Sequence, residues 1–161
     1  PDYAVTGVQT CALPIWVLII EDHVDLAEGL RELLEFDGHE VSVAYSGAEG
    51  LAKACEFLPE ILLCDIGLPG MDGYAVARAF RADEVLREVY LVALTGYALP
   101  EDLQRAADAG FDRHLAKPPD LEALERMLAE VPGGGSAGNR GAPGVSWILM
   151  ERVKRKGGKM R

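Results

Sequence analysis

The sequence predicts a doubly wound α/β domain over residues 15–131, with five parallel strands and helices on both faces of the sheet. The first observation is a set of short apolar runs separated by stretches of helical period: Trp16–Ile20, Val41–Tyr45, Ile61–Cys64, Tyr90–Leu94 and Phe111–Ala116. The first and third runs are apolar at consecutive positions, which is typical of strands covered on both faces. Strict alternation of strands and helices indicates parallel strands joined by right-handed crossovers.

Apolar spacing identifies the first and last helices of this domain. Leucines and a valine recur there at intervals of three and four residues, which places them on one side of a helix. The residues expected to be buried are Leu26, Leu30, Leu33 and Leu34 in the first helix and Leu121, Leu124, Leu128 and Val131 in the last.

Capping residues predict where the other helices begin. Ser46 and Glu49 have the spacing of a capping box, in which the two side chains satisfy free N–H groups of the first turn. Asp72 and Asp120 are suitable N-caps, and Pro100 suits the first turn of a helix.

Length and charge limit the remaining organisation. At about 150 residues per domain, a chain of 161 residues accommodates one domain. The net charge is −10, but residues 1–131 hold 9 Lys and Arg against 25 Asp and Glu, whereas residues 132–161 hold 7 against 1. Because an acidic body repels nucleic-acid phosphates, we expect no direct nucleic-acid binding.

The two ends of the chain lack the regular pattern of the centre. We expect residues 1–14 to be a non-native or disordered leader and the Gly-rich, then basic, residues 132–161 to be a flexible tail. The longest apolar run, Cys11–Ile20, contains Pro14 and is too short for a membrane-spanning helix, which needs roughly 20 residues. Three cysteines without disulfide or metal-ligand spacing favour a reducing, cytoplasmic location.

Reactive side chains follow four of the five predicted strands. They are Glu21 and Asp22 after the first strand, Asp65 after the third, Thr95 after the fourth and Lys117 after the fifth. Ligands of open parallel sheets bind at the carboxyl ends of the strands, so we expect these side chains to converge. Each alone is adequately explained as a solvated loop residue, a cap or a structural residue, and the coincidence of four correct positions carries the prediction.

The chemistry expected of this cluster is phosphoryl transfer. Carboxylates brought together need a cation, and oxygen ligands without His or Cys favour Mg²⁺. A carboxylate beside such an ion can accept a phosphoryl group, and the central Asp65 is the candidate nucleophile. Thr95 and Lys117 are candidates for binding the phosphoryl oxygens.

Four segments resemble the receiver domain of two-component response regulators: WVLIIEDHVDLAEGLRELL, ILLCDIGLPGMDGY, VALTGYA and AGFDRHLAKPPD. The resemblance extends over residues 15–131 and implies the flavodoxin-like strand order 2-1-3-4-5. It implies that Asp65 is the phosphoacceptor and that Mg²⁺ is bound by Glu21, Asp22, Asp65 and the backbone carbonyl of Gly67.

The resemblance also assigns a switch and partners. Thr95 corresponds to the switch hydroxyl, and Lys117 to the active-site lysine, with a cis peptide bond to Pro118. His114 stands where the family usually has Tyr or Phe, so it is either a rotating switch residue or a surface histidine packed on a neighbour.

The implied partners are a histidine kinase or histidine phosphotransfer protein and a downstream protein partner, and the resemblance allows a phosphorylation-dependent dimer. The domain is either a stand-alone receiver or the C-terminal receiver of a hybrid histidine kinase.

Other functions stay open beside this signalling role, which is that of a phosphoacceptor rather than an enzyme. A Mg²⁺-dependent aspartyl-phosphate phosphohydrolase generally has a general-acid Asp two residues after its nucleophile, where this chain has Gly67. A nucleotide or flavin module needs a Gly- or hydroxyl-rich phosphate loop after the first strand, where residues 21–25 are largely acidic. An unphosphorylated pseudo-receiver would act through a constitutive binding surface.

Overall fold

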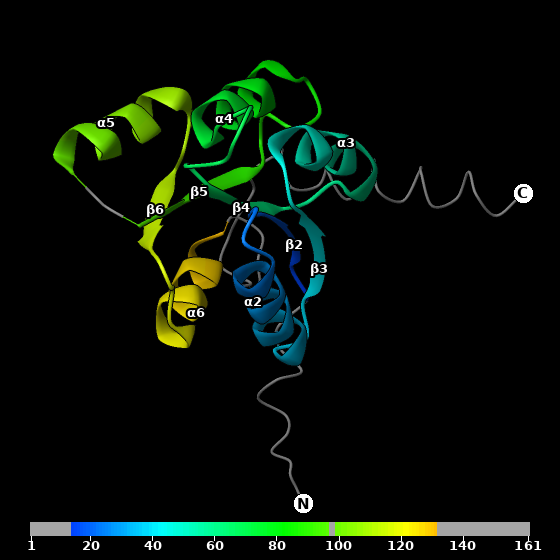
Figure 1. The fold of residues 1–161 in the computed structure, drawn as a ribbon. Helices are drawn as coiled ribbons and strands as arrows, with labels where there is room; N and C mark the ends of the chain where they lie inside the picture. Colours follow the sequence, from blue (N-terminus) through cyan, green and yellow to red (C-terminus); the bar gives the residue numbers. More distant parts are fainter. Residues whose placement is uncertain (1–13, 97–98, 132–161) are drawn as a thin grey trace, which may run out of the picture.

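A computed structural model of the chain describes residues 14–96 and 99–131. Strands and helices alternate along this part (Figure 1): β2 (Trp16–Ile20), α2 (Val24–Phe36), β3 (Glu40–Ala44), α3 (Gly47–Phe57), β4 (Ile61–Asp65), α4 (Gly73–Ala82), β5 (Tyr90–Thr95), α5 (Pro100–Ala109), β6 (Arg113–Ala116) and α6 (Leu121–Glu130). The expectations for the leader and for the tail concern residues outside the described ranges, apart from Pro14.

The five strands form one parallel sheet in the order β3-β2-β4-β5-β6. Numbered along the chain, this is the predicted order 2-1-3-4-5, and the predicted fold class is confirmed. Ile20 of β2 pairs with Cys64 of β4, so the next residues, Glu21 and Asp65, leave their strands at the same edge. This register sets the position of the candidate site.

Helices cover both faces of the sheet, with α3, α4 and α5 on one face and α2 and α6 on the other (Figure 1). Alternate residues of the central strands point to opposite faces, as the pleat requires. Leu18, Leu62 and Leu91 enter the core with Phe80 of α4. Val17, Leu63, Val92 and Ile61 enter the second core with Leu30, Leu34 and Leu124.

Two residues predicted to be buried are exposed, which corrects the expected helix faces. The side of α2 that meets the sheet is formed by Ala27, Leu30 and Leu34, and Leu33 lies about 100° around the helix from Leu34, at 39% exposure. Leu121, at 45% exposure, is the first residue of α6, whose buried residues are Leu124, Met127 and Leu128. Leucine spacing alone did not distinguish the centre of the apolar stripe from its margin.

Four of the predicted strands also change their boundaries. The third and fourth extend by one residue, to Asp65 and Thr95, so these two residues end their strands rather than follow them. The second strand runs from Glu40 to Ala44 rather than from Val41 to Tyr45. The last is limited to Arg113–Ala116, and Phe111, which was expected to start it, is buried just before it in the core under α5.

The predicted caps are present. Ser46 Oγ accepts a hydrogen bond from Glu49 N at 3.1 Å, and Asp72 and Asp120 cap α4 and α6 in the same way. Pro100 opens α5. The cap of α2 was not predicted from the sequence: His23 Nδ1 accepts a hydrogen bond from Leu26 N at 3.2 Å. None of the described helices is long and apolar enough to cross a membrane.

Candidate functional site

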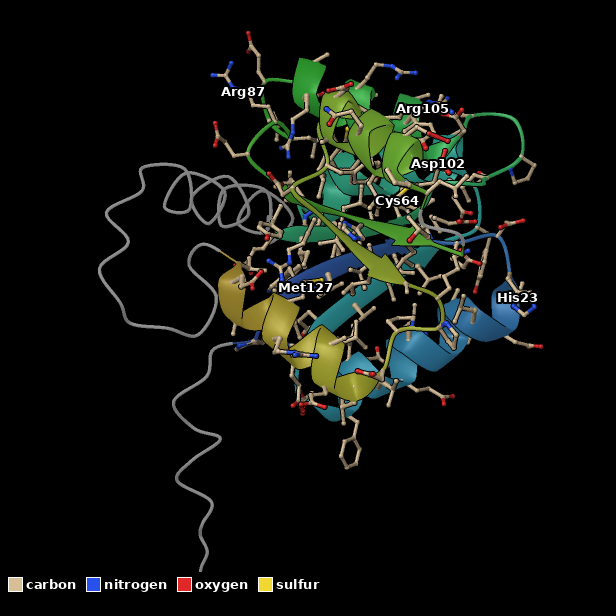
Figure 2. All side chains as sticks on the ribbon, turned by 90° about the vertical axis from the view of Figure 1, so that its left-hand side faces the viewer. His23, Cys64, Arg87, Asp102, Arg105 and Met127 are labelled. Carbon is tan, nitrogen blue, oxygen red and sulfur yellow. The ribbon has the colours of Figure 1, made fainter. Side chains whose placement is uncertain are left out.

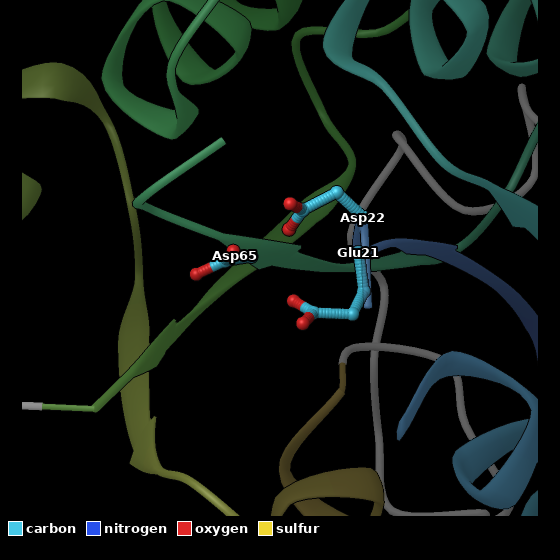
Figure 3. Close-up of side chains that lie close together, drawn as sticks. All are labelled: Glu21, Asp22 and Asp65. Carbon is cyan, nitrogen blue, oxygen red and sulfur yellow. The ribbon is translucent and has the colours of Figure 1, made fainter. Parts of the chain in front are cut away.

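Three carboxylates meet at the carboxyl edge of the sheet (Figure 3). Glu21 and Asp22 follow β2, and Asp65 ends β4. One ligand oxygen from each residue lies within 4.8 Å of the others. The structure therefore brings together the three acids that the sequence analysis singled out.

The three acids differ in their surroundings. Glu21 is 1% exposed and Asp65 is 6% exposed, whereas Asp22 is exposed. Gly73 at the start of α4 allows a close approach of helix and strand, because a Cβ there would lie 2.5 Å from the carbonyl oxygen of Asp65. The pocket wall beside Asp65 is therefore set by backbone contact.

Lys117 joins this cluster from the loop after β6. Its Nζ lies 2.8 Å from Asp65 Oδ1 and donates to Glu21 at 3.1 Å from Oε2. The peptide bond between Lys117 and Pro118 is cis, as the resemblance implied. Gly67 N donates to Asp65 Oδ1 at 3.1 Å, which helps to fix the orientation of this carboxylate.

Burial and pairing shift the pKa values of these groups. Burial raises the pKa of Glu21, and the hydrogen bond from Lys117 opposes this. Burial also works against the charge of Lys117, but its hydrogen bonds to Asp65 and Glu21 outweigh that effect and raise the pKa of Lys117. The ammonium therefore stays charged at neutral pH and compensates part of the acidic cluster.

The donor set fits a hard divalent cation. When Glu21, Asp22 and Asp65 are all ionised, the charge of Lys117 compensates one of the three carboxylates. Two negative charges then remain uncompensated in a small, largely buried volume. Carboxylate oxygens without nitrogen or sulfur ligands are what Mg²⁺ prefers. The exposure of Asp22 leaves one side of the cluster open to solvent.

Thr95, the last residue of β5, lies at the wall of a cavity of about 500 Å³ that Asp65 also lines, and its carbonyl oxygen accepts a 2.9 Å hydrogen bond from Lys117 N. It is 4% exposed, and its Oγ1 donates a 3.4 Å hydrogen bond to the carbonyl oxygen of Leu115. The cavity is also lined by Asp65, Ile66, Gly67, Leu68, Asp72, Tyr74, Leu94, Gly96, Asp102 and Arg105. Asp65 can thus be approached from this cavity.

Two of the sequence candidates lie at the margin of the site. The first candidate is Gly67, whose backbone N–H donates the hydrogen bond to the carboxylate of Asp65, so its backbone lies close to this carboxylate. His114 pairs in register with Ala93 and is exposed, so it occupies the outer surface of β6.

Three residues of the cavity wall were not predicted from the sequence: Arg105, Asp102 and Tyr74. The spacing of Asp102 and Arg105 places them on one side of α5, soon after Thr95, and that was the available signal. Cys64 beside Asp65 packs in the core, and burial raises its pKa well above the ordinary value.

Comparison with known proteins gives consistent matches. The response regulator receiver domain family matches residues 17–129. An uncharacterized 14.6 kDa protein of Leptolyngbya boryana is 34% identical over 114 residues, which are 71% of this chain and 87% of that protein. The transcriptional regulatory protein KdpE of Mycobacterium tuberculosis is 33% identical over 116 residues, 71% of this chain but 50% of that protein, so the chain spans about half the length of this regulator.

Solved structures show the same architecture. Chemotaxis protein CheY4 of Vibrio cholerae superposes with a TM-score of 0.71 at 28% identity, over 74% of this chain and 99% of that one. The receiver domain of sensor histidine kinase PA1611 from Pseudomonas aeruginosa, which holds a magnesium ion in its active site cleft, has a TM-score of 0.68 at 30% identity, over 74% and 98%. This chain belongs to the response regulator receiver domain family.

Proposed function

We propose that this domain accepts a phosphoryl group from a phosphohistidine donor onto Asp65, within a two-component phosphorelay. The observation that carries the proposal is that two kinds of charge-stabilising group lie close to Asp65. Lys117 Nζ lies 2.8 Å from its carboxylate, and Thr95 lines the same cavity as Asp65. The donor is a histidine kinase or a histidine phosphotransfer protein.

In the proposed step, a carboxylate oxygen of Asp65 attacks the phosphorus atom of the donor. An O–P bond forms, the P–N bond to the donor imidazole breaks, and its electron pair stays on that nitrogen. Lys117 and Thr95 would then bind phosphoryl oxygens, where negative charge gathers during the transfer. Gly67 N holds Asp65 Oδ1 in place before the attack.

Glu21, Asp22, Asp65 and the backbone carbonyl of Gly67 would hold Mg²⁺. A bound Mg²⁺ supplies positive charge to the phosphoryl oxygens. The support for it is the acidic cluster of this chain together with the magnesium ion in the PA1611 receiver domain. Glu21 and Asp65 keep their side chains fixed through shared hydrogen bonds to Lys117.

The output would be a changed protein-binding surface. A phosphoryl group on Asp65 would draw the Thr95 hydroxyl away from its weak 3.4 Å bond to Leu115 O. The surface of α5 and β6, which carries His114, would repack in response and alter binding of a downstream protein. We place these events in the cytoplasm, a reducing compartment that suits a chain with three cysteines and no disulfide or metal-ligand spacing.

The test is the intact mass of the protein after incubation with Mg²⁺ and acetyl phosphate, a small phosphodonor. We expect one added phosphoryl group in the wild type, and none in Asp65→Asn or in the presence of a chelator. Modification of Asp65→Asn at the wild-type level would show that another residue is the acceptor. A folded wild type that stays unmodified at every Mg²⁺ concentration would instead be a pseudo-receiver with a constitutive binding surface.

A further inference from the structure

One cation outside the acidic cluster faces the same space as Asp65. Arg105 of α5 lines the cavity of about 500 Å³ to which Asp65 and Thr95 also contribute. Among the described residues that line this cavity, Arg105 carries the single positive charge, and Lys117 is not part of the lining although its Nζ lies 2.8 Å from Asp65 Oδ1. Figure 2 shows Arg105 close to Asp102 near the carboxyl end of the sheet.

Arg105 is held there by a weak contact. Its guanidinium carbon lies 4.5 Å from the centroid of the Tyr74 ring, a cation–π distance. Tyr74 is 7% exposed, so the ring is a fixed support, whereas Arg105 itself is exposed. No ion pair of Arg105 within 4.0 Å is present in the part of the chain that the structure describes. The guanidinium can therefore leave the ring at small cost.

Three carboxylates near Arg105 set its electrostatic surroundings. Asp72 and Asp102 line the same cavity, and Asp108 lines an adjoining hollow of about 200 Å³ with Arg105. These groups keep a cation at the cavity, but they also repel an incoming phosphoryl group, which brings about 1.5 to 2 negative charges. The guanidinium is the one group of the lining that can offset this repulsion.

The helix that carries Arg105 is only lightly anchored. The buried residues of α5 are Ala106 and Ala109, whose side chains are a single methyl group. A helix that packs through alanines can shift over the sheet with little repacking of large side chains. A movement of the Arg105 side chain would therefore shift the helix α5 that carries it.

We propose that Arg105 leaves the Tyr74 ring when Asp65 is phosphorylated, binds the phosphoryl oxygens with its guanidinium, and so couples the position of α5 to the state of Asp65. This inference rests on the proposed phosphorylation of Asp65. The planar guanidinium fork matches the geometry of phosphoryl oxygens, and the charge-assisted bond to them is stronger than the exposed ring contact it replaces.

The test uses beryllofluoride, which mimics a phosphoryl group on a carboxylate, with Mg²⁺ and the full chain. Arg105→Gln is compared with Arg78→Gln, which removes the same charge from the adjoining hollow but not from the cavity that Asp65 lines. We expect Arg105→Gln to bind beryllofluoride about five- to tenfold more weakly than the wild type, and Arg78→Gln to bind as the wild type does. Cooperative thermal unfolding of each variant confirms that it is folded.

A second readout separates phosphoryl binding from a merely structural role. In the wild type, beryllofluoride should slow hydrogen exchange of α5 amides, and in Arg105→Gln this protection should be lost while that of β4 remains. Asp102→Asn, which removes a repelling carboxylate, should bind beryllofluoride more tightly than the wild type.

Three results would overturn the inference. Equal affinities of Arg105→Gln and wild type would show that the guanidinium makes no contact, and equal losses in Arg105→Gln and Arg78→Gln would reveal a net-charge effect. A wild type that binds no beryllofluoride and accepts no phosphoryl group would instead refute the proposed function, and this inference would fail with it.

Discussion

Lys117 donates a hydrogen bond to Glu21 although 96 residues separate them, with Nζ 3.1 Å from Oε2. The same ammonium lies 2.8 Å from Asp65 Oδ1. Glu21 is almost fully buried, at 1% exposure, so its charge relies on this partner. The Lys117 ammonium therefore compensates one carboxylate of the site, and the remaining negative charge can still be compensated by a metal ion.

Lys117→Met should destabilise the protein in a chelator by about 1–3 kcal/mol, because it leaves two buried carboxylates facing one another without compensation. The change keeps the apolar stem and removes the charge. Addition of Mg²⁺ should recover part of the loss, since the ion takes over the compensation. Chemical denaturation with and without Mg²⁺ measures both values, and equal stability of variant and wild type in chelator would contradict the role given to Lys117.

Asp22→Asn should separate metal binding from folding. Asp22→Asn removes one of the mutually repelling carboxylates, so in chelator it should not destabilise the protein and should raise the free energy of unfolding by about 0.5–1 kcal/mol. Mg²⁺ at ten times its Kd should stabilise the wild type by roughly 1.4 kcal/mol through mass action, and the variant by less at the same concentration. Thermal unfolding over a Mg²⁺ titration measures the difference. Identical Mg²⁺ dependence of the two proteins would remove Asp22 from the ligand set.

Much of the fold and the position of the site could be predicted, because both depend on local pattern. Consecutive apolar residues identified β2 and β4, and the rule that ligands lie at carboxyl ends placed Asp65 next to Glu21 before any distance was known. The edge strand β6 was harder to predict. Only one of its residues, Leu115, is half-buried and the others are exposed, so its apolar pattern in the sequence is weak.

The convergence of Glu21, Asp65 and Lys117 was predicted, but how these side chains pair and which of them are buried was not. Glu21 is 1% exposed whereas the adjacent Asp22 is exposed, and no spacing in the sequence distinguishes the two. The stack of Arg105 on Tyr74 depends on the separation of α4 and α5. The cap at His23 escaped notice because His is an uncommon N-cap.

His39 should make the stability of the fold depend on pH. Its Nδ1 accepts a hydrogen bond from Ile15 N at 3.0 Å, which requires the unprotonated nitrogen. Burial lowers the pKa of His39 below its ordinary 6.5, while Asp37, with Oδ2 4.0 Å from Nε2, opposes this. Between the two pKa values the unfolded chain holds a proton that the folded chain lacks, so acid favours unfolding from about pH 6.5 downward.

His39→Asn tests this pH dependence. The Asn side-chain oxygen can replace Nδ1 as the acceptor for Ile15 N but does not titrate. The free energy of unfolding of the variant should therefore fall less steeply than that of the wild type between about pH 7.5 and 5.5. Parallel denaturation curves over this range would show that His39 contributes nothing to the acid sensitivity, since the carboxylates are common to both proteins.

Arg81→Lys should cost about 1–3 kcal/mol although the charge is kept. The guanidinium of Arg81 donates to Gly110 O at 2.7 and 3.0 Å, to Val89 O at 2.8 Å and to Asp112 Oδ2 at 2.7 Å. It thereby ties α4 to the starts of β5 and β6, and a single ammonium cannot reach all of these acceptors. Arg78→Lys, on the exposed side of the same helix, is the control and should change stability by less than about 0.5 kcal/mol. Equal effects of the two substitutions in urea denaturation would rule out the bridging role of Arg81.

Two phenylalanines provide a matched measure of the core. Phe80 of α4 is 0% exposed and packs in the cluster under α3, α4 and α5, whereas Phe36 at the end of α2 is 93% exposed. Phe80→Ala should lower the free energy of unfolding by about 3–5 kcal/mol, because it removes buried apolar surface and leaves a cavity. Phe36→Ala removes the same atoms from contact with water and should change stability by less than about 0.5 kcal/mol. Urea denaturation of both variants measures the difference, and a large loss in Phe36→Ala would mean that this ring is covered in the folded protein.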